Sequence, residues 1–73
     1  MTLLRLPDIE LVSAAVHAAW MTSKKDQGVE SRKSEDDEEL MVPYEQLSEK
    51  AKELDRSTVR AVYAAILSTD ANR

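Results

Sequence analysis

The chain has 73 residues, which is enough for one small domain and too few for a catalytic domain beside it. It contains no Cys and a single His, so disulfides, thiolate chemistry and the usual zinc sites are excluded. The net charge of −4 argues against a protein that coats nucleic acid, because such a protein needs a basic surface. A chain this short has a core that is only marginally large enough for stability. Its composition excludes disulfides and the usual zinc sites but does not exclude stabilisation by a partner subunit.

The first predicted helix covers about residues 8–25. Its apolar side chains recur at spacings of three and four, which places them on one helical face. They are Ile9, Val12, Val16 and Ala19. Asp8 is the predicted N-cap because a carboxylate can accept hydrogen bonds from the first free backbone N–H groups. Four alanines in this segment favour the helix further.

Residues 26–42 lack a helical pattern and are predicted to form an acidic loop. The segment contains Gly28 and five consecutive acids, Glu35 to Glu39. Without these five acids the rest of the chain would carry +1, so most of the molecule is close to neutral. The run lacks the alternating spacing of a calcium-binding loop. We therefore interpret it as a solvated loop that is either functional or partly disordered.

The segment from Leu40 to Tyr44 is predicted to be an extended connector that lies against the helices. Pro43 favours an extended conformation for the residue before it. Ser48 can then cap a short helix over residues 49–54. The inward residues of this short helix would be Leu47, Ala51 and Leu54.

Asp55 is predicted to cap a last helix that runs to about residue 69. The apolar face of this helix would contain Val59, Val62, Ala65, Ile66 and Leu67. The predicted fold is thus mainly α: a small single domain over residues 1–73, with two main helices, a short helix and an extended Val-Pro-Tyr connector.

Three side chains on the first helix form a candidate ligand site. His17, Trp20 and Lys24 lie three and four residues apart and share a helical face. Such a face suits a planar, anionic ligand, since Trp can stack on a base, Lys can meet a phosphate and His can form a hydrogen bond. The same spacing also fits a core Trp and a His that satisfies a backbone group, and both interpretations stay open.

Arg56 and Arg60 lie one turn apart near the expected start of the last helix. There they could bind phosphate, because free N–H groups at a helix N-terminus attract anions. Surface pairing with Glu53 or Asp55 explains them equally well. No nucleophile with a base, no metal cluster and no cofactor motif is visible, so we expect no enzymatic activity, no metal and no cofactor.

The order of these residues resembles the RyR domain, a small repeat found in tandem pairs in ryanodine receptors and singly in bacterial and viral proteins. The resemblance covers about residues 9–67. It is carried by His17-Ala18-Ala19-Trp20, Lys24, Gly28, Met41-Val42-Pro43-Tyr44-Glu45-Gln46-Leu47-Ser48-Glu49, Lys52 and Asp55-Arg56-Ser57-Thr58-Val59. The chain departs from the family at Val29, where an aromatic residue is usual, and it lacks a further loop glycine.

The resemblance implies a helical fold in which two repeats pack about a pseudo-twofold axis and accommodate an adenine nucleotide. It implies that Trp20 stacks on the base and that His17, Lys24, Tyr44 and Arg56 line the same cleft. A single repeat lacks its neighbour, so we expect a homodimer whose cleft uses residues of both subunits.

Two functions follow as hypotheses. The first is non-enzymatic binding or sequestration of a nucleotide-derived small molecule, such as an adenine nucleotide, ADP-ribose or a cyclic-nucleotide signal. The protein would act in immune signalling, as a sensor or as a viral anti-defence sponge. The alternative is a protein–protein interaction adaptor that uses the acidic loop or an apolar helix face. The sequence has no apolar run long enough to span a membrane. We expect a cytoplasmic protein, of a bacterial or virus-infected cell, that binds neither membrane nor nucleic acid polymer.

Overall fold

The computed structural model describes residues 6–71, and this part of the chain is mainly helical. Helix α1 spans Ile9–Asp26, the 3₁₀ helix η1 spans Tyr44–Gln46, and helix α2 spans Glu49–Ala71. Among residues 6–71, β-type backbone pairing is limited to one isolated bridge in the loop, between Lys33 and Glu39. The prediction of a small, mainly α domain with two main helices is confirmed.

Helix α1 has the predicted N-cap and a glycine at its end. The Asp8 carboxylate accepts hydrogen bonds from the backbone N–H groups of Glu10 at 3.2 Å and Leu11 at 3.4 Å. After Asp26 the chain turns through Gly28, whose φ of 82° lies in the left-handed region that favours glycine. This geometry lets the next N–H, that of Val29, bond back to the helix.

Helix α2 corrects the prediction of a short helix followed by a second cap. Residues 49–71 form one continuous helix of 23 residues. Ser48 caps it, since its hydroxyl accepts from the backbone N–H of Ala51 at 3.1 Å. Asp55 is not a cap but lies inside the helix, and its carboxylate faces His17 of α1. No Gly or Pro interrupts the helix at this point. The contact with His17 explains why an Asp, a residue typical of helix N-caps, lies inside the helix.

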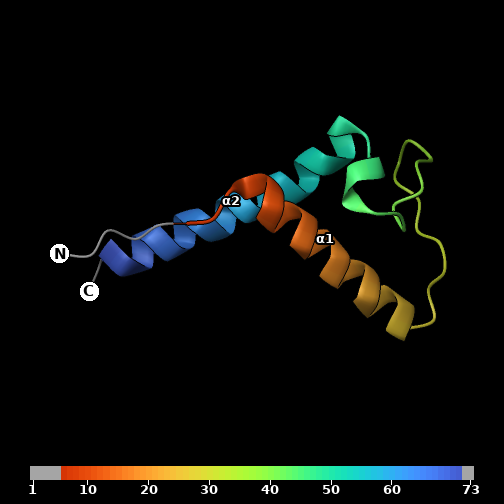
Figure 1. Cartoon of the computed structure of the whole chain (residues 1–73), viewed down its shortest axis with the longest axis horizontal. Coiled ribbons are helices and arrows are strands. Elements are labelled where there is room, and N and C mark those ends of the chain that lie inside the picture. Colours follow the sequence, from red (N-terminus) through yellow and green to blue (C-terminus); the bar gives the residue numbers. More distant parts are fainter. Residues whose placement is uncertain (1–5, 72–73) are drawn as a thin grey trace.

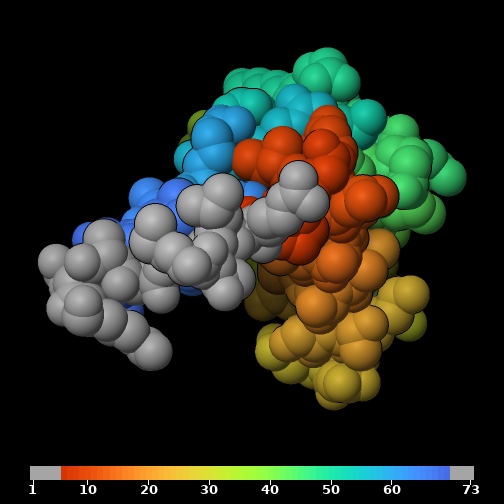
Figure 2. All heavy atoms as spheres, turned by 60° about the vertical axis from the view of Figure 1, so that its left-hand side comes forward, coloured from red at the N-terminus to blue at the C-terminus, as the bar shows by residue number. Residues whose placement is uncertain are grey.

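The two helices cross, and α2 continues well beyond the crossing. Figure 1 shows α1 leaving the crossing toward the loop, while the C-terminal half of α2 extends in the opposite direction. In the space-filling view this half projects from the body formed by α1, the loop and the first turns of α2 (Figure 2). The hydroxyl of Tyr63 on this half donates to the carbonyl of Pro7 at 2.9 Å.

The buried core is small and lies where α1, the connector and the start of α2 meet. It contains Tyr44, Leu47 and Ala51, with Ala14, Leu40 and Val42 packed against it. Val59, further along α2, is 2% exposed. The connector packs against the helices as predicted, although its last residue, Tyr44, begins the 3₁₀ helix.

Other predicted core positions lie at the surface. Leu54 is 64% exposed, so the prediction that it points inward is wrong. Val62, Ile66 and Leu67 are also exposed, because α1 does not extend along the C-terminal half of α2.

The acidic loop is ordered by its own carboxylates. The carboxylate of Glu39 accepts from the Ser31 hydroxyl and from the backbone N–H groups of Arg32 at 2.9 Å and Met41 at 3.0 Å. These bonds lower the pKa of Glu39 to about 2, with the Ser31 contact as the largest cause. Glu35, Asp36 and Asp37 are exposed, as expected for a solvated loop, but Glu39 is bound to donors of its own segment.

Two more of the five acids attach the loop to the start of α2. The carboxylate of Glu38 accepts from the Ser48 hydroxyl at 2.6 Å and from its backbone N–H at 2.8 Å. The ammonium of Lys50 contacts Asp36 at 2.5 Å. Negative charge at a helix N-terminus is favourable because the helix dipole is positive there. The loop thus closes onto α2 through charge-assisted contacts.

Replacing Leu47 or Leu54 by Ala tests where the core ends. Leu47→Ala should lower the free energy of unfolding by about 2–5 kcal/mol, because it opens a cavity in the core. Leu54→Ala removes the same atoms from an exposed position and should cost less than about 0.5 kcal/mol. Urea unfolding followed by circular dichroism measures both, and equal losses would contradict the described core.

Candidate functional site

His17 lies at the centre of the candidate site and joins three segments of the chain. It is 4% exposed. Its Nε2 lies 2.8 Å from the carbonyl oxygen of Val42, which can only accept, so Nε2 carries a proton and donates. Its Nδ1 lies 3.4 Å from a carboxylate oxygen of Asp55. The two ring nitrogens therefore face the connector and α2, and a hydrogen bond between Nδ1 and the Asp55 carboxylate requires a further proton on one of these two groups.

The carboxyl group of Asp55 is partly removed from water by this contact. Burial raises the pKa of Asp55, and the neighbouring imidazole of His17 partly offsets that effect. The side chain is 23% exposed, so solvent or a ligand can still reach it.

Trp20 packs on the imidazole of His17 and leaves part of its indole uncovered. The two rings are stacked, with centroids 5.5 Å apart and planes at 28°. Trp20 is half-buried and lies at the edge of the core, so it is not simply the largest core residue. An aromatic surface held in this way is available to a planar molecule.

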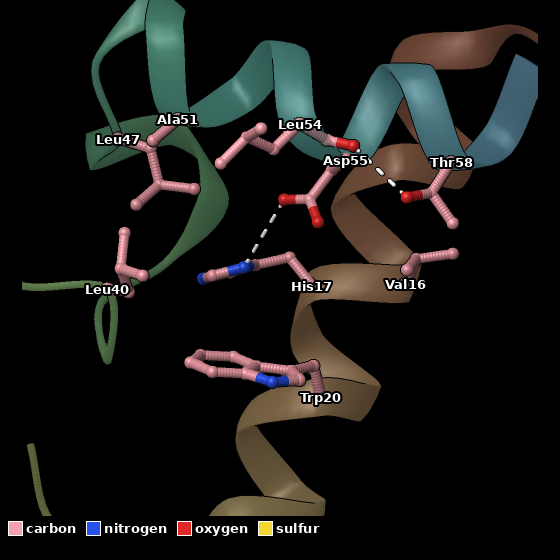
Figure 3. A pocket seen from close by; sticks show the side chains of 9 residues that line it. All are labelled: Val16, His17, Trp20, Leu40, Leu47, Ala51, Leu54, Asp55 and Thr58. Atoms are coloured by element: carbon pink, nitrogen blue, oxygen red, sulfur yellow. Dashed lines mark hydrogen bonds and ion pairs between the residues drawn. The ribbon is translucent and has the colours of Figure 1, made fainter. Parts of the chain in front are cut away.

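A cavity of about 260 Å³ opens beside these rings. Its lining comes from α1, the connector region and α2, and most of it is apolar. The lining residues are Val16, His17, Trp20, Leu40, Leu47, Ala51, Leu54, Asp55 and Thr58. Figure 3 shows Asp55 and Trp20 on opposite sides of the His17 ring, with Leu40 and Leu47 facing them from the connector side. An apolar cavity with a few polar groups is the usual form of a small-molecule site.

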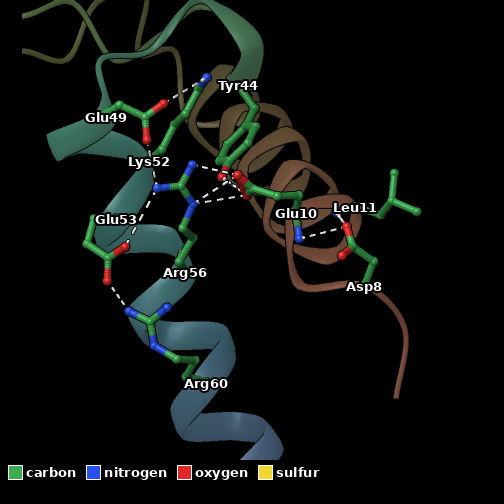
Figure 4. Close-up of polar contacts among 9 residues, drawn as sticks. All are labelled: Asp8, Glu10, Leu11, Tyr44, Glu49, Lys52, Glu53, Arg56 and Arg60. Atoms are coloured by element: carbon green, nitrogen blue, oxygen red, sulfur yellow. Dashed lines mark hydrogen bonds and ion pairs between the residues drawn. The ribbon is translucent and has the colours of Figure 1, made fainter. Parts of the chain in front are cut away.

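A second polar cluster surrounds Arg56, which is 17% exposed. Its guanidinium contacts Glu10 of α1 at 2.5 Å and Glu49 at 2.9 Å, and it lies 3.6 Å from Glu53. The hydroxyl of Tyr44 donates to the same Glu10 at 2.5 Å. Figure 4 shows the guanidinium enclosed by these acids. Arg56 thus ties α1 to α2, and its positive charge is already balanced by neighbouring carboxylates.

The contacts within this cluster shift the pKa values of its members. The Arg56 guanidinium, followed by the Tyr44 hydroxyl, lowers the pKa of Glu10 to about 2. Glu10 in turn raises the pKa of Arg56. Burial, with the Glu10 contact second, raises the pKa of Tyr44.

The five predicted site residues divide between these two places. His17 and Trp20 line the cavity, and Lys24 lies one turn beyond Trp20 without lining it. The Tyr44 ring lies 6.4 Å from His17, centroid to centroid, but its hydroxyl is bound in the Glu10 cluster. Arg56 belongs wholly to that cluster. The structure therefore joins two of the five residues in one cavity.

The expectation of a phosphate site at Arg56 and Arg60 loses its structural basis. Helix α2 begins at Glu49, so both arginines lie well inside the helix and away from its free N–H groups. Each contacts Glu53, as the alternative interpretation of surface pairing held.

Sequence reasoning missed the roles of Asp55 and Glu10. Asp55 lies four residues after Ala51 and four before Val59, and both of these are buried. An acid on an otherwise apolar helical face was therefore the pattern that could have indicated a contact with another segment. Glu10 and Arg56 are 46 residues apart, and no local pattern marks them as partners.

The RyR domain family model matches residues 7–72, which is nearly the whole chain. This chain belongs to the RyR domain family. The resemblance found in the sequence is thereby confirmed. No curated protein and no solved structure matches the chain significantly. None of the helices among residues 6–71 is both long enough and apolar enough to cross a membrane.

Glu10→Gln tests the contribution of the Arg56 cluster through its pH dependence. Because folding lowers the pKa of Glu10 from 4.5 to about 2, its contribution to stability is present above pH 4.5 and is lost as the pH falls through about 2. The variant should be less stable at neutral pH and should lose less stability between pH 4.5 and 2 than the wild type.

Urea unfolding at a series of pH values between 2 and 5 measures this difference. Glu45→Gln makes the same chemical change at an exposed position of η1 and serves as the control. A pH dependence for Glu10→Gln that matches the wild type would show that the cluster contributes nothing.

Proposed function

We propose that this RyR domain binds a nucleotide-derived small molecule without converting it, with the planar ring of the ligand packed against Trp20 in the cavity. The observation that carries the proposal is the partly uncovered indole of Trp20, held on the buried ring of His17 at the wall of an apolar cavity. Stacking of a base on an aromatic side chain contributes about 1–3 kcal/mol. In a domain this small, such a contact is a large share of any binding energy.

The size of the cavity supports a ring as the part of the ligand that enters it. A volume of about 260 Å³ is slightly below the usual range for sites that enclose a drug-sized molecule. We therefore propose that the base lies inside and that the sugar and any phosphate lie outside. Lys24, one turn from Trp20, forms no ion pair within residues 6–71 and is the predicted contact for a phosphate.

The exposed C-terminal half of α2 supports a homodimer as the functional unit. Residues 57–69 contain one charged side chain, Arg60. Val62, Ile66 and Leu67 on this half are 40–50% exposed. A helix with so few charges is normally covered. We propose that a second copy covers it and that the pair forms the complete binding unit.

The protein-interaction adaptor stays as the second candidate, favoured by the same exposed apolar residues of α2. The acidic loop gives it less support than the sequence suggested, because Asp36, Glu38 and Glu39 contact donors of their own chain. Under the first proposal, that of a ligand-binding protein, the domain would act by holding its ligand, either as a sensor or as a sponge in immune signalling within the cytoplasm.

A ligand panel tests the proposed function directly. Adenine nucleotides, ADP-ribose and cyclic nucleotides are added while Trp20 fluorescence and thermal stability are recorded. A true ligand at 100 times its dissociation constant should add about 2.7 kcal/mol to the stability. Trp20→Ala should abolish the thermal response, whereas Trp20→Phe keeps an aromatic surface and should retain part of it. No response of the wild type to any member at millimolar concentration would rule out binding of these ligands.

Sedimentation equilibrium tests the dimer. The wild type should be dimeric at tens of micromolar, and Ile66→Lys should be monomeric because it places a charge on the apolar face of α2. Leu11→Lys makes a comparable change on α1, at a residue that is 72% exposed, and should remain dimeric. A wild type that is monomeric at this concentration would contradict the dimer.

A further inference from the structure

We infer that residues 31–41 form a lid beside the ligand cavity, which moves as one body and is attached to the start of α2 mainly by Glu38. The inference adds to the site a moving part that controls access to it. The effect on ligand entry rests on the proposed function, whereas the movement of the lid can be measured in the free protein.

The lid is a short hairpin that is held together by bonds of its own. The backbone N–H of Leu40 donates to the carbonyl of Arg32 at 2.7 Å. The backbone N–H of Ser34 donates to the carbonyl of Glu38 at 2.9 Å. The Glu39 carboxylate, bound to donors of the same segment, joins the two ends of the hairpin. All these bonds lie inside the lid, so they persist when the lid moves as a whole.

The chain is fixed to α1 on both sides of the lid. Before the lid, the backbone N–H of Val29 donates to the carbonyl of Lys24 at 2.9 Å. After the lid, the carbonyl of Val42 accepts from His17 at 2.8 Å. Figure 1 shows the segment between them leaving the end of α1 and returning beside the start of α2. The lid can therefore turn about these two points while α1 stays in place.

The polar attachment of the lid to α2 depends on one carboxylate. Glu38 accepts from the Ser48 hydroxyl at 2.6 Å and from the Ser48 backbone N–H at 2.8 Å. The positive end of the helix dipole strengthens this contact. The other polar contact joins Asp36 to Lys50, whose side chains are 58% and 74% exposed, and such surface pairs contribute little.

The lid supplies a wall that two cavities share. The ligand cavity and a neighbouring cavity of about 430 Å³ have Leu40, Ala51 and Leu54 in common. Ala51 and Leu54 belong to α2, whereas Leu40 belongs to the lid and faces the cavity from the side opposite α1 (Figure 3). Leu40 also packs against the core, which favours the closed position. When the lid opens, Leu40 moves with it, so the two cavities join and the route to Trp20 widens.

Relaxation-dispersion NMR of the free protein tests the movement, because it detects exchange on the microsecond-to-millisecond timescale. Glu38→Ala should show one shared exchange rate for the amides of residues 31–41 and no such exchange in α1. Its open population should exceed that of the wild type at least about tenfold, the factor lost with one hydrogen bond to a charged group. If Glu38→Ala does not fold, Glu38→Gln should show a smaller increase.

Two further variants serve as controls. Glu35→Ala removes a neighbouring exposed acid that forms no hydrogen bond or ion pair within residues 6–71, and it should leave the open population unchanged. Glu39→Ala breaks bonds inside the hairpin, so hydrogen exchange at the amides of Ser34 and Leu40 should accelerate. In Glu38→Ala these two amides should exchange as slowly as in the wild type. A lid that unfolds in Glu38→Ala, or that shows no shared exchange, would overturn the inference.

Association kinetics connect the lid with the proposed function. Stopped-flow mixing with AMP, followed by Trp20 fluorescence, should show association at least about threefold faster for Glu38→Ala than for Glu35→Ala, which loses the same charge. Equal rates would overturn the role of the lid in ligand entry while the proposed function stands. If neither AMP nor any other member of the panel binds, the proposed function fails, and the NMR measurement still decides whether the lid opens.

Discussion

The hydrogen bond from the buried ring of His17 to the carbonyl of Val42 is the contact on which the rest of the domain depends. It joins α1 to the connector, and the second ring nitrogen faces Asp55 of α2. The hydrophobic core beside it is small, so a few polar contacts between segments carry much of the arrangement. A buried hydrogen bond contributes about 0.5–1.5 kcal/mol net, but leaving either partner unsatisfied costs more.

Because the ring nitrogens of His17 face other protein groups, Trp20 is the aromatic side chain of the cavity that has surface available for a ligand. The imidazole holds the indole in place by stacking, and the cavity opens beside both rings. Glu10 and Arg56 form a second link between the helices. The carboxylate of Glu39 holds the loop together, and that of Glu38 attaches the loop to the start of α2. Charged side chains thus support the fold at three places, while the cavity itself is lined mainly by apolar groups.

The sequence predicted those features that depend on neighbouring residues along the chain. The two main helices, the cap at Asp8 and the cap at Ser48 follow from local patterns and are confirmed. Asp55 was mistaken for a cap because Asp is typical of helix starts, and only the fold reveals that it meets His17. The ion pair of Glu10 with Arg56 joins residues far apart in sequence, so local spacing could not have found it. The family resemblance implied that Arg56 lines the ligand cleft, whereas in the structure its guanidinium contacts Glu10 and Glu49.

Nitrogen-15 NMR of the His17 side chain is the most direct test of this central contact. The Nε2 atom should carry a proton, with a measurable coupling across the hydrogen bond to the carbonyl carbon of Val42, throughout the pH range in which the protein is folded. An Nε2 that lacks a proton in the folded protein, as in the tautomer protonated on Nδ1 alone, would contradict the role of His17 as the link between α1 and the connector.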